Sequence, residues 1–316
     1  MKGVVLARSG GTFRVQTEIG EVKAVLRGRV KHADDQRLVA GDVVLLDTET
    51  GGPARILSME PRHSVLARRA ATGGTAVRRA QPIAANVDQV VVVTSARDPE
   101  PSPRMLDRFL VIAEANGLPA AIVVNKVELD RSAVPPLASR YASAGYQVLA
   151  TSAKLGEGLV ALRDLLRGRA TVFTGASGVG KSSLLNALEP GLKLRIGAIS
   201  EKWRSGTHTT RAAELVPVVL AAGGGGGVGY VVDTPGMREV ATWGIEPDQL
   251  GACFPEFRPF LDQCRFDNCR HLQEPGCAIH AAVATGRCDP DRLRSYERIY
   301  EEVSVPAWSS GRRRGR

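Results

Sequence analysis

The chain has 316 residues, 43% of them hydrophobic and 24% charged, a composition that supports packed cores and excludes a largely disordered protein. Lysine and arginine number 42 against 33 acidic residues; the net charge of +9 favours a polyanionic partner such as nucleic acid, although a basic surface without a special role fits too. No apolar run approaches the roughly 18 residues of a membrane span, and the apolar stretch after Met1 is too short for a signal peptide, so we expect a cytoplasmic protein without a membrane partner.

Residues 1–61 contain short segments, such as "TFRVQT" and "GDVVLLDT", in which apolar and polar residues alternate between glycine-containing or charged turns. This pattern predicts the strands of a small β-barrel. The next segment, 62–84, carries five arginines and no acidic residue from Arg62 to Arg79. We expect a flexible basic linker here, which either binds a partner or is simply solvated.

Residues 85–242 alternate between strands and helices. Continuous apolar runs such as "VDQVVVVTSA" and "PAAIVVNK" are typical of parallel strands that are buried on both faces. Helical patterns are expected at 104–116, 132–144 and 157–167, and further strands at "YQVLATS", "ATVFTG", 212–220 and 228–232. The alternation predicts an α/β domain with an open sheet and helices on both faces.

The remaining chain divides into residues 243–305, which hold a cysteine cluster and a predicted helix at 289–303, and a basic tail at 306–316. We expect the former to be a mainly helical metal-binding domain.

The stretch "GASGVGKS" has the spacing G-x-x-x-x-G-K-[ST] between a predicted strand and a predicted helix. Its glycines let backbone N–H groups turn toward phosphate oxygens, while Lys181 reaches the terminal phosphates and the Ser182 hydroxyl can hold Mg²⁺. This P-loop does not by itself separate ATP from GTP. The nucleotide-binding residues expected here are Gly175, Ala176, Ser177, Gly178, Val179, Gly180, Lys181, Ser182 and Ser183.

The stretch "YVVDTPG" places Asp233 and Gly236 at the end of a predicted buried strand. A carboxylate there can hold Mg²⁺ through water, and the glycine N–H can meet a γ-phosphate. Asp233 also fits an ordinary turn residue.

Two further motifs, "NKVE" and "TSAK", end two other strands and resemble the guanine-reading pair of GTPases. They contribute Asn125, Lys126, Val127, Glu128, Ser152, Ala153 and Lys154. With them the chain resembles the translational-type GTPases, but the base motifs precede the phosphate motif. That order indicates a circular permutation, which leaves the site intact because every motif follows the carboxyl end of a strand.

The first switch segment is expected within "RSGTHTTRAAEL". Thr210 resembles the threonine that closes over Mg²⁺ and the γ-phosphate, with Thr209 as the alternative and a helix cap as its ordinary role. Many GTPases carry a water-orienting glutamine directly after the glycine of DxxG, where this chain has Met237. We therefore expect His208 to orient the attacking water, although a solvated histidine also fits.

The stretch "CRFDNCRHLQEPGC" supplies three cysteines and one histidine within 14 positions. Three thiolates and an imidazole satisfy tetrahedral Zn²⁺ and leave no position for substrate, so the site would be structural. Reduced, buried cysteines without metal are the alternative. The expected ligands are Cys264, Cys269, His271 and Cys277, whereas Cys253, Cys288 and His280 are expected to be packing residues.

From about residue 1 to residue 303 the chain resembles the ribosome small-subunit-dependent GTPase A (RsgA) family of bacteria. The anchors are "NVDQ", "NKVE", "TSAK", "GASGVGKSSLLNAL", "HTT", "DTPG" and the cysteine cluster. The resemblance implies an N-terminal OB-fold, binding of GTP or GDP with Mg²⁺, and one structural Zn²⁺. It also implies binding to the 30S ribosomal subunit and its 16S rRNA late in assembly, with stimulated GTP hydrolysis driving release.

Two departures and two other functions bear on this expectation. Glu128 replaces the usual Asp of the base motif, and its extra methylene is expected to push the carboxylate toward the guanine edge. We expect the preference for guanine to survive, because the acceptor chemistry is unchanged, and the affinity to fall. Phe13 is the one aromatic residue in the first 60, so phosphate and shape contacts with RNA are favoured over base stacking.

The alternative function is a nucleotide-gated rRNA-binding module with incidental hydrolysis. A DNA-associated ATPase is disfavoured by the base motifs. We expect a monomer, since no heptad pattern is visible.

Overall fold

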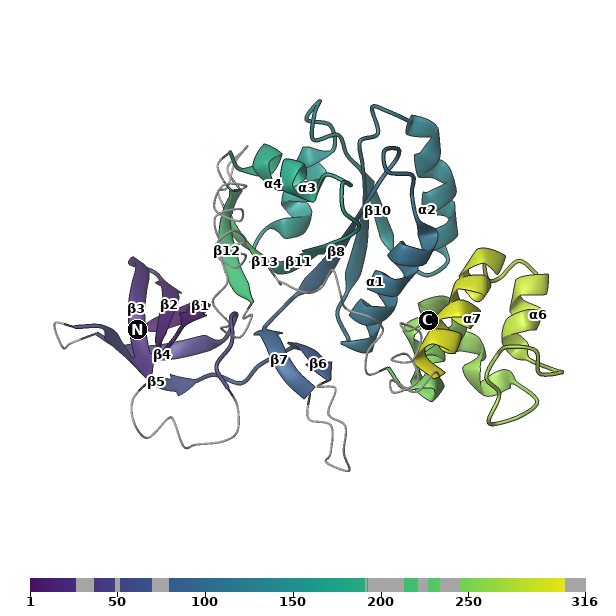
Figure 1. Ribbon diagram of the computed structural model, residues 1–316, viewed down its shortest axis with the longest axis horizontal. Coiled ribbons are helices and arrows are strands. Elements are labelled where there is room, and N and C mark those ends of the chain that lie inside the picture. The colour runs from purple at the N-terminus through teal and green to yellow at the C-terminus, as the bar shows by residue number, and fades with distance from the viewer. Residues whose placement is uncertain are drawn as a thin grey trace, which may run out of the picture.

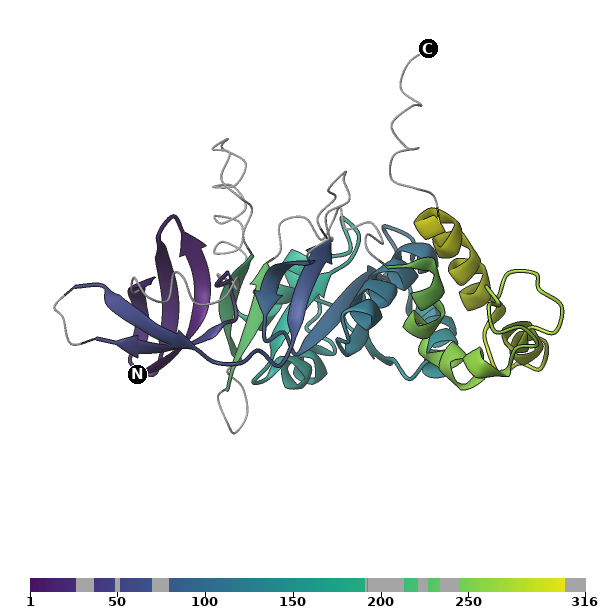
Figure 2. The same ribbon diagram turned by 90° about the horizontal axis from the view of Figure 1, so that it is seen from below.

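The structure is a computed structural model, and it describes residues 1–26, 37–48, 52–69, 80–190, 192, 213–220, 227–233 and 245–304. Three parts follow one another along the long axis of the molecule: a barrel at one end, a central sheet with its helices, and a helical module at the other end (Figures 1 and 2). No helix among the described residues is long and apolar enough to cross a membrane.

The N-terminal part is a closed five-stranded barrel with the strand order β1-β2-β3-β5-β4, and β4 pairs back onto β1. Alternate residues point inward: in β2 the buried positions are Phe13, Val15 and Thr17. The predicted barrel is therefore confirmed. Its strands are β1 (Lys2–Ser9), β2 (Thr12–Thr17), β3 (Gly20–Leu26), β4 (Val43–Asp47) and β5 (Ala54–Met59).

The segment expected to be a flexible linker instead contains a two-stranded antiparallel sheet, formed by β6 (Val65–Arg69) and β7 (Ala80–Ala85). Leu66 and Ala84 are buried in the same hydrophobic cluster as Val87, which anchors the hairpin to the central domain. Burial of these apolar residues outweighs the effect of the surrounding arginines. Residues 70–79 lie outside the described part of the chain.

The central domain is a six-stranded sheet in the order β10-β9-β8-β11-β13-β12, parallel except for the edge strand β12. Its strands are β8 (Gln89–Ser95), β9 (Ala120–Asn125), β10 (Gln147–Ala150), β11 (Ala170–Thr174), β12 (Glu214–Leu220) and β13 (Gly227–Asp233). All seven residues of β8 are buried, as the continuous apolar run predicted. The open sheet is thus confirmed.

Helices cover both faces of this sheet. The helices are α1 (Pro103–Ala115), α2 (Val134–Ala142), which follows the short turn η1 (Arg131–Ala133), α3 (Leu159–Leu166) and α4 (Lys181–Leu188). Val90 and Val92 of β8 share a buried cluster with α1 and α2, whereas Val91 and Val93 share one with α3 and α4. This two-residue alternation within one strand is what gives the sheet its two packed faces.

The C-terminal module contains α6 (Ala278–Ala284), α7 (Pro290–Ser304) and three 3₁₀ segments, η2 (Pro247–Gln249), η3 (Gly251–Cys253) and η4 (Pro255–Gln263). Its core includes Phe254, Phe257 and Tyr296, and Val111 of α1 packs into the same cluster. The mainly helical module and the helix at its end agree with the prediction. The domain boundaries expected at 61/62, 84/85, 242/243 and 305/306 stay predictions.

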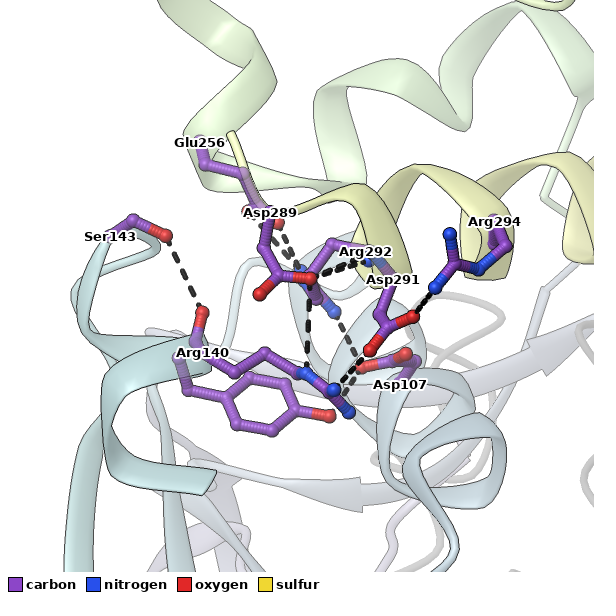
Figure 3. Close-up of polar contacts among 9 residues, drawn as sticks. Asp107, Arg140, Ser143, Glu256, Asp289, Asp291, Arg292 and Arg294 are labelled. Carbon is purple, nitrogen blue, oxygen red and sulfur yellow. Dashed lines mark hydrogen bonds and ion pairs between the residues drawn. The ribbon is translucent and has the colours of Figure 1, made fainter. Parts of the chain in front are cut away.

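A buried arginine connects this module to the central domain (Figure 3). Arg292 of α7 is fully buried and contacts Asp107 of α1 (Nη1 to Oδ1, 2.7 Å) and Glu256 of η4 (Nε to Oε1, 2.6 Å). The hydroxyl of Tyr141 on α2 donates to the same Oδ1 of Asp107 at 2.7 Å. Since buried carboxylates require a partner, Arg292 fixes α7 against α1 and α2.

Replacing Arg292 by methionine is expected to lower the free energy of unfolding by about 3–5 kcal/mol, because Asp107 and Glu256 would be left as buried, unpaired charges. The control is Arg294→Met, which removes the same group from an arginine whose side chain is 58% exposed, and should cost under about 1 kcal/mol. Urea denaturation of the full chain measures both. Equal stability of the two variants would contradict the assigned role of Arg292.

Candidate nucleotide and metal sites

The predicted nucleotide motifs meet at one edge of the central sheet. The P-loop follows β11, "NKVE" begins at the last residue of β9, and "TSAK" follows β10. These three strands and β8, which lies between β9 and β11, are all parallel. Chain order reverses on the two sides of β8, whose neighbours are β9 and β11. Loops at the carboxyl ends of strands beside such a reversal form the usual binding crevice of an α/β sheet.

Two glycines of the P-loop adopt conformations that a side chain would prevent. Gly175 has φ +140° and lies so close to β8 that a Cβ would be 2.1 Å from the carbonyl oxygen of Val93. Gly180 has φ +94°, and its Cβ would be 2.3 Å from Nδ2 of Asn125. Both positions therefore require glycine, as the motif predicted.

Helix α4 begins at Lys181, directly after Gly180, so the P-loop ends at a helix N-terminus. Nζ of Lys181 donates to the carbonyl oxygens of Gly175 (2.7 Å) and Ala176 (2.6 Å), which holds the ammonium group over the loop. Ser182 and Ser183 are exposed on the first helical turn. A positive dipole end, an ammonium group and an exposed hydroxyl fit a phosphate chain with Mg²⁺.

The side chain of Asn125 joins the base motifs to the P-loop. Its Nδ2 donates to the carbonyl oxygen of Val179 at 3.0 Å, and its Oδ1 accepts from the backbone N–H of Ala153 at 3.2 Å. Asn125 is 1% exposed. One amide thus fixes three loops relative to one another, a role that the sequence motif alone does not reveal.

The rest of the base motifs is held by local contacts. Ser152 is fully buried and its Oγ accepts from the N–H of Leu155 at 3.0 Å, which shapes the "TSAK" turn. The N–H of Val127 donates to the carbonyl oxygen of Thr151 at 3.2 Å, so the two base loops are also joined through the backbone. Lys126 adopts a left-handed φ of +61°, and Lys154 is exposed.

Glu128 offers an acceptor that fits a guanine edge. Its Oε2 is shielded from solvent and has no hydrogen-bond partner among the described residues. A buried carboxylate oxygen without a donor is costly, and guanine presents N–H donors on its base-pairing edge. The N1–H or the exocyclic amino group of guanine could supply the donor that this oxygen lacks.

A segment that the motifs did not single out also borders the site. The carbonyl oxygen of Asp98 accepts from Nζ of Lys126, and Ser95 Oγ donates to the carbonyl oxygen of Pro99 at 2.6 Å. A Cβ on Gly178 would lie 3.5 Å from Cδ of Pro99. The signal available in the sequence is that this segment follows the carboxyl end of the central strand.

Asp233 is the last residue of β13, beside the P-loop strand β11, and its side chain is not described. Four expected or alternative switch residues and the water-orienting position lie outside the described part of the chain: His208, Thr209, Thr210, Gly236 and Met237.

The four predicted metal ligands are brought together in the C-terminal module, with their ligand atoms all within 4.8 Å of one another. Nδ1 of His271 is 3.5 Å from Sγ of both Cys264 and Cys277, and those two sulfurs are 4.0 Å apart. A tetrahedral Zn²⁺ with Zn–S of about 2.3 Å and Zn–N of about 2.0 Å separates its ligands by about 3.5–3.8 Å. The cluster therefore fits a structural zinc ion.

Burial affects the protonation of these ligands. It lowers the pKa of His271, which keeps the imidazole neutral, and raises the pKa of Cys269 to about 12. Thiols in such surroundings stay protonated unless a cation lowers their pKa, so metal binding would release protons. Cys253 and Cys288 lie outside the cluster and are buried, in agreement with a packing role.

Glu274 orders the loop between His271 and Cys277. Its carboxylate accepts from the backbone N–H groups of Arg270 (3.2 Å), Leu272 (2.9 Å) and Gln273 (3.1 Å). Burial alone would raise the pKa of Glu274, but these hydrogen bonds and the Arg270 side chain outweigh it and lower the pKa to about 2. Glu274 thus supports the ligand loop from outside the cluster.

Changing Cys264 to serine is expected to reduce the zinc content from about one ion per chain to nearly none, because one of four ligands and its charge are lost. The matched control is Cys288→Ser, which removes a buried thiol outside the cluster and should retain the metal. Native mass spectrometry reads both out. Full zinc occupancy in Cys264→Ser would contradict the ligand assignment.

Known proteins resemble the chain over nearly its whole length. A family model described as RsgA GTPase matches residues 59–243. A curated relative from Gemmatimonas aurantiaca, "Small ribosomal subunit biogenesis GTPase RsgA", is 48% identical and is matched over 95% of this chain and 97% of its own. A relative of the same name from Moorella thermoacetica is 38% identical over 96% and 97% of the two chains.

Solved structures agree with this. The crystal structure of YjeQ from Thermotoga maritima superposes with a TM-score of 0.76 at 32% identity and covers 96% of this chain and 98% of its own. YloQ, described as a circularly permuted GTPase, gives a TM-score of 0.70 at 28% identity over 96% and 94% of the two chains. The permuted order of the motifs, the P-loop geometry and these matches lead to one conclusion: the chain belongs to the RsgA GTPase family.

Proposed function

We propose that this protein is a GTPase that binds the small (30S) ribosomal subunit late in its maturation and leaves it after hydrolysing GTP. The observation that supports the proposal is the Asn125 side chain, which joins the loops of "NKVE" and "TSAK" to the P-loop. The names of the relatives, which describe small ribosomal subunit biogenesis, support the choice of the subunit as partner.

In the proposed site each chain segment has a separate task. Backbone N–H groups of residues 175–182 and the Lys181 ammonium group bind the phosphates, while Asn125, Glu128 and the turn at Ser152 to Lys154 bind the guanine. Ser182 and Thr210 would hold Mg²⁺ directly and Asp233 would hold it through water; the ion would neutralise charge on the phosphates. Gly236 donates its N–H to the γ-phosphate.

Hydrolysis adds one water to the γ-phosphorus and releases GDP and phosphate. We assign His208 the task of orienting that water, because Met237 at the usual glutamine position has no hydrogen-bonding group for it. Intrinsic turnover is then slow until binding to the subunit completes the catalytic arrangement around the nucleotide. This dependence makes hydrolysis a checkpoint on a correctly formed subunit.

The partner is proposed to be 16S rRNA, contacted through its phosphates and shape. The net charge of +9 supports attraction to a polyanion. Phe13 is 2% exposed in the barrel core and so cannot stack on a base. We further propose that the protein acts as a monomer in the cytoplasm, with a barrel at 1–61, a connecting segment that contains β6 and β7 at 62–84, the GTPase domain at 85–242, the zinc domain at 243–305 and a basic tail at 306–316.

Adding purified 30S subunits is expected to raise the steady-state rate of GTP turnover by at least about tenfold, since the subunit completes the catalytic geometry. The control is Lys181→Met, which should hydrolyse little GTP under either condition. His208→Ala should lose the stimulated rate. Tight subunit binding by the wild-type protein without stimulation would instead favour a nucleotide-gated rRNA-binding module.

A further inference from the structure

A buried carboxylate on the edge strand of the GTPase sheet has its partner in the barrel. Glu214, the first residue of β12, is 7% exposed. Nη1 of Arg14, on strand β2 of the barrel, donates to its Oε1 at 2.6 Å. The two residues are 200 positions apart in the chain, so this contact depends on the position of the barrel relative to the sheet.

The barrel covers strand β12 beside this ion pair. Strand β1 lies against β12 (Figure 1), and Leu6 of β1 shares a buried hydrophobic cluster with Ala213 and Leu215. An uncovered edge strand would offer unpaired backbone groups, which the barrel shields here. The Arg14–Glu214 pair thus belongs to a packed interface.

The guanidinium group of Arg14 is oriented from the barrel side as well. Its Nε donates to Oε1 of Glu21 on β3 at 2.7 Å, and its Nη2 lies 3.4 Å from Oε2 of the same residue. Glu21 therefore presents Arg14 to Glu214 in a defined direction. A change in the position of the barrel would therefore move or break the hydrogen bond to Glu214 at the start of β12.

The first residue of β12 lies close to the expected beginning or end of both switch segments. In the antiparallel register of β12 and β13, Glu214 is the partner of Asp233, where the "DTPG" motif begins. Thr210, the expected switch threonine, is four positions before Glu214 in the sequence. Glu214 is thus adjacent to one switch along the chain and to the other across the sheet.

We propose that Arg14 and Glu214 form a positioning contact that transmits attachment of the barrel on the small subunit to the two switch segments. The pair is needed for subunit-stimulated hydrolysis but not for intrinsic hydrolysis. Because Arg14 already contacts the Glu214 carboxylate, fixing the barrel on the subunit also fixes the position of the first residue of β12. This inference rests on the proposed function.

The test is a double-mutant cycle with Arg14→Gln, Glu214→Gln and the double variant. Each single change is expected to lower the kcat measured at saturating 30S subunits by at least about fivefold, the lower end of coupling between two sites. Intrinsic turnover and the Kd for the subunit should change less than about twofold. The double variant should be no worse than either single variant, because the pair acts as one unit.

The matched control is Lys2→Gln. It removes the same single positive charge from the barrel, where Lys2 forms an exposed pair with Glu60, and should leave the stimulated kcat unchanged. An equal loss in Lys2→Gln, an unchanged stimulated rate in Arg14→Gln, or a parallel fall in the intrinsic rate would overturn the inference. A wild-type protein that subunits do not stimulate would overturn the proposed function itself, and this inference with it.

Discussion

The hydrogen bonds of one buried amide organise the nucleotide site. Asn125 ends strand β9 and binds the carbonyl oxygen of Val179 in the P-loop and the N–H of Ala153 in the second base loop. The close approach of these loops leaves no room for a side chain at Gly180. The P-loop and the loops of "NKVE" and "TSAK" are therefore joined into one rigid unit, although they come from three different connections of the sheet.

This constraint explains why the permuted order of the motifs is compatible with activity. The loops meet because parallel strands β9, β10 and β11 end at the same edge, whatever the order of their connections. What the circular permutation changes is which other parts of the chain are connected to the two ends of the central domain. The barrel packs against β12, whose first residue pairs with Asp233, whereas the C-terminal module is fixed by Arg292 to α1 and α2. The proposed contact of the subunit with the barrel would thus act on β12, whose first residue pairs with Asp233.

Features with a local pattern could be predicted from the sequence, and features that depend on distant partners could not. The buried strand "QVVVVTS", the P-loop and the spacing of the metal ligands each show in a few consecutive residues. By contrast, Asn125 meets Val179 54 positions away, and Arg292 meets Asp107 185 positions away. The hairpin was missed because arginines dominate its local composition, while the burial of Leu66 and Ala84 depends on the central domain.

The proposed nucleotide site depends most directly on the close approach of Gly180 to Asn125, and calorimetric titration of GDP onto Gly180→Ala tests this dependence. The added methyl would displace the Asn125 amide and separate the P-loop from the base loops, so we expect an affinity loss of about a hundredfold. Gly117→Ala is the control, since Gly117 also has a positive φ (+65°) but no atom within 4 Å of its Cβ position; it should bind GDP like the wild type. Wild-type affinity in Gly180→Ala would contradict the claim that this contact builds the site.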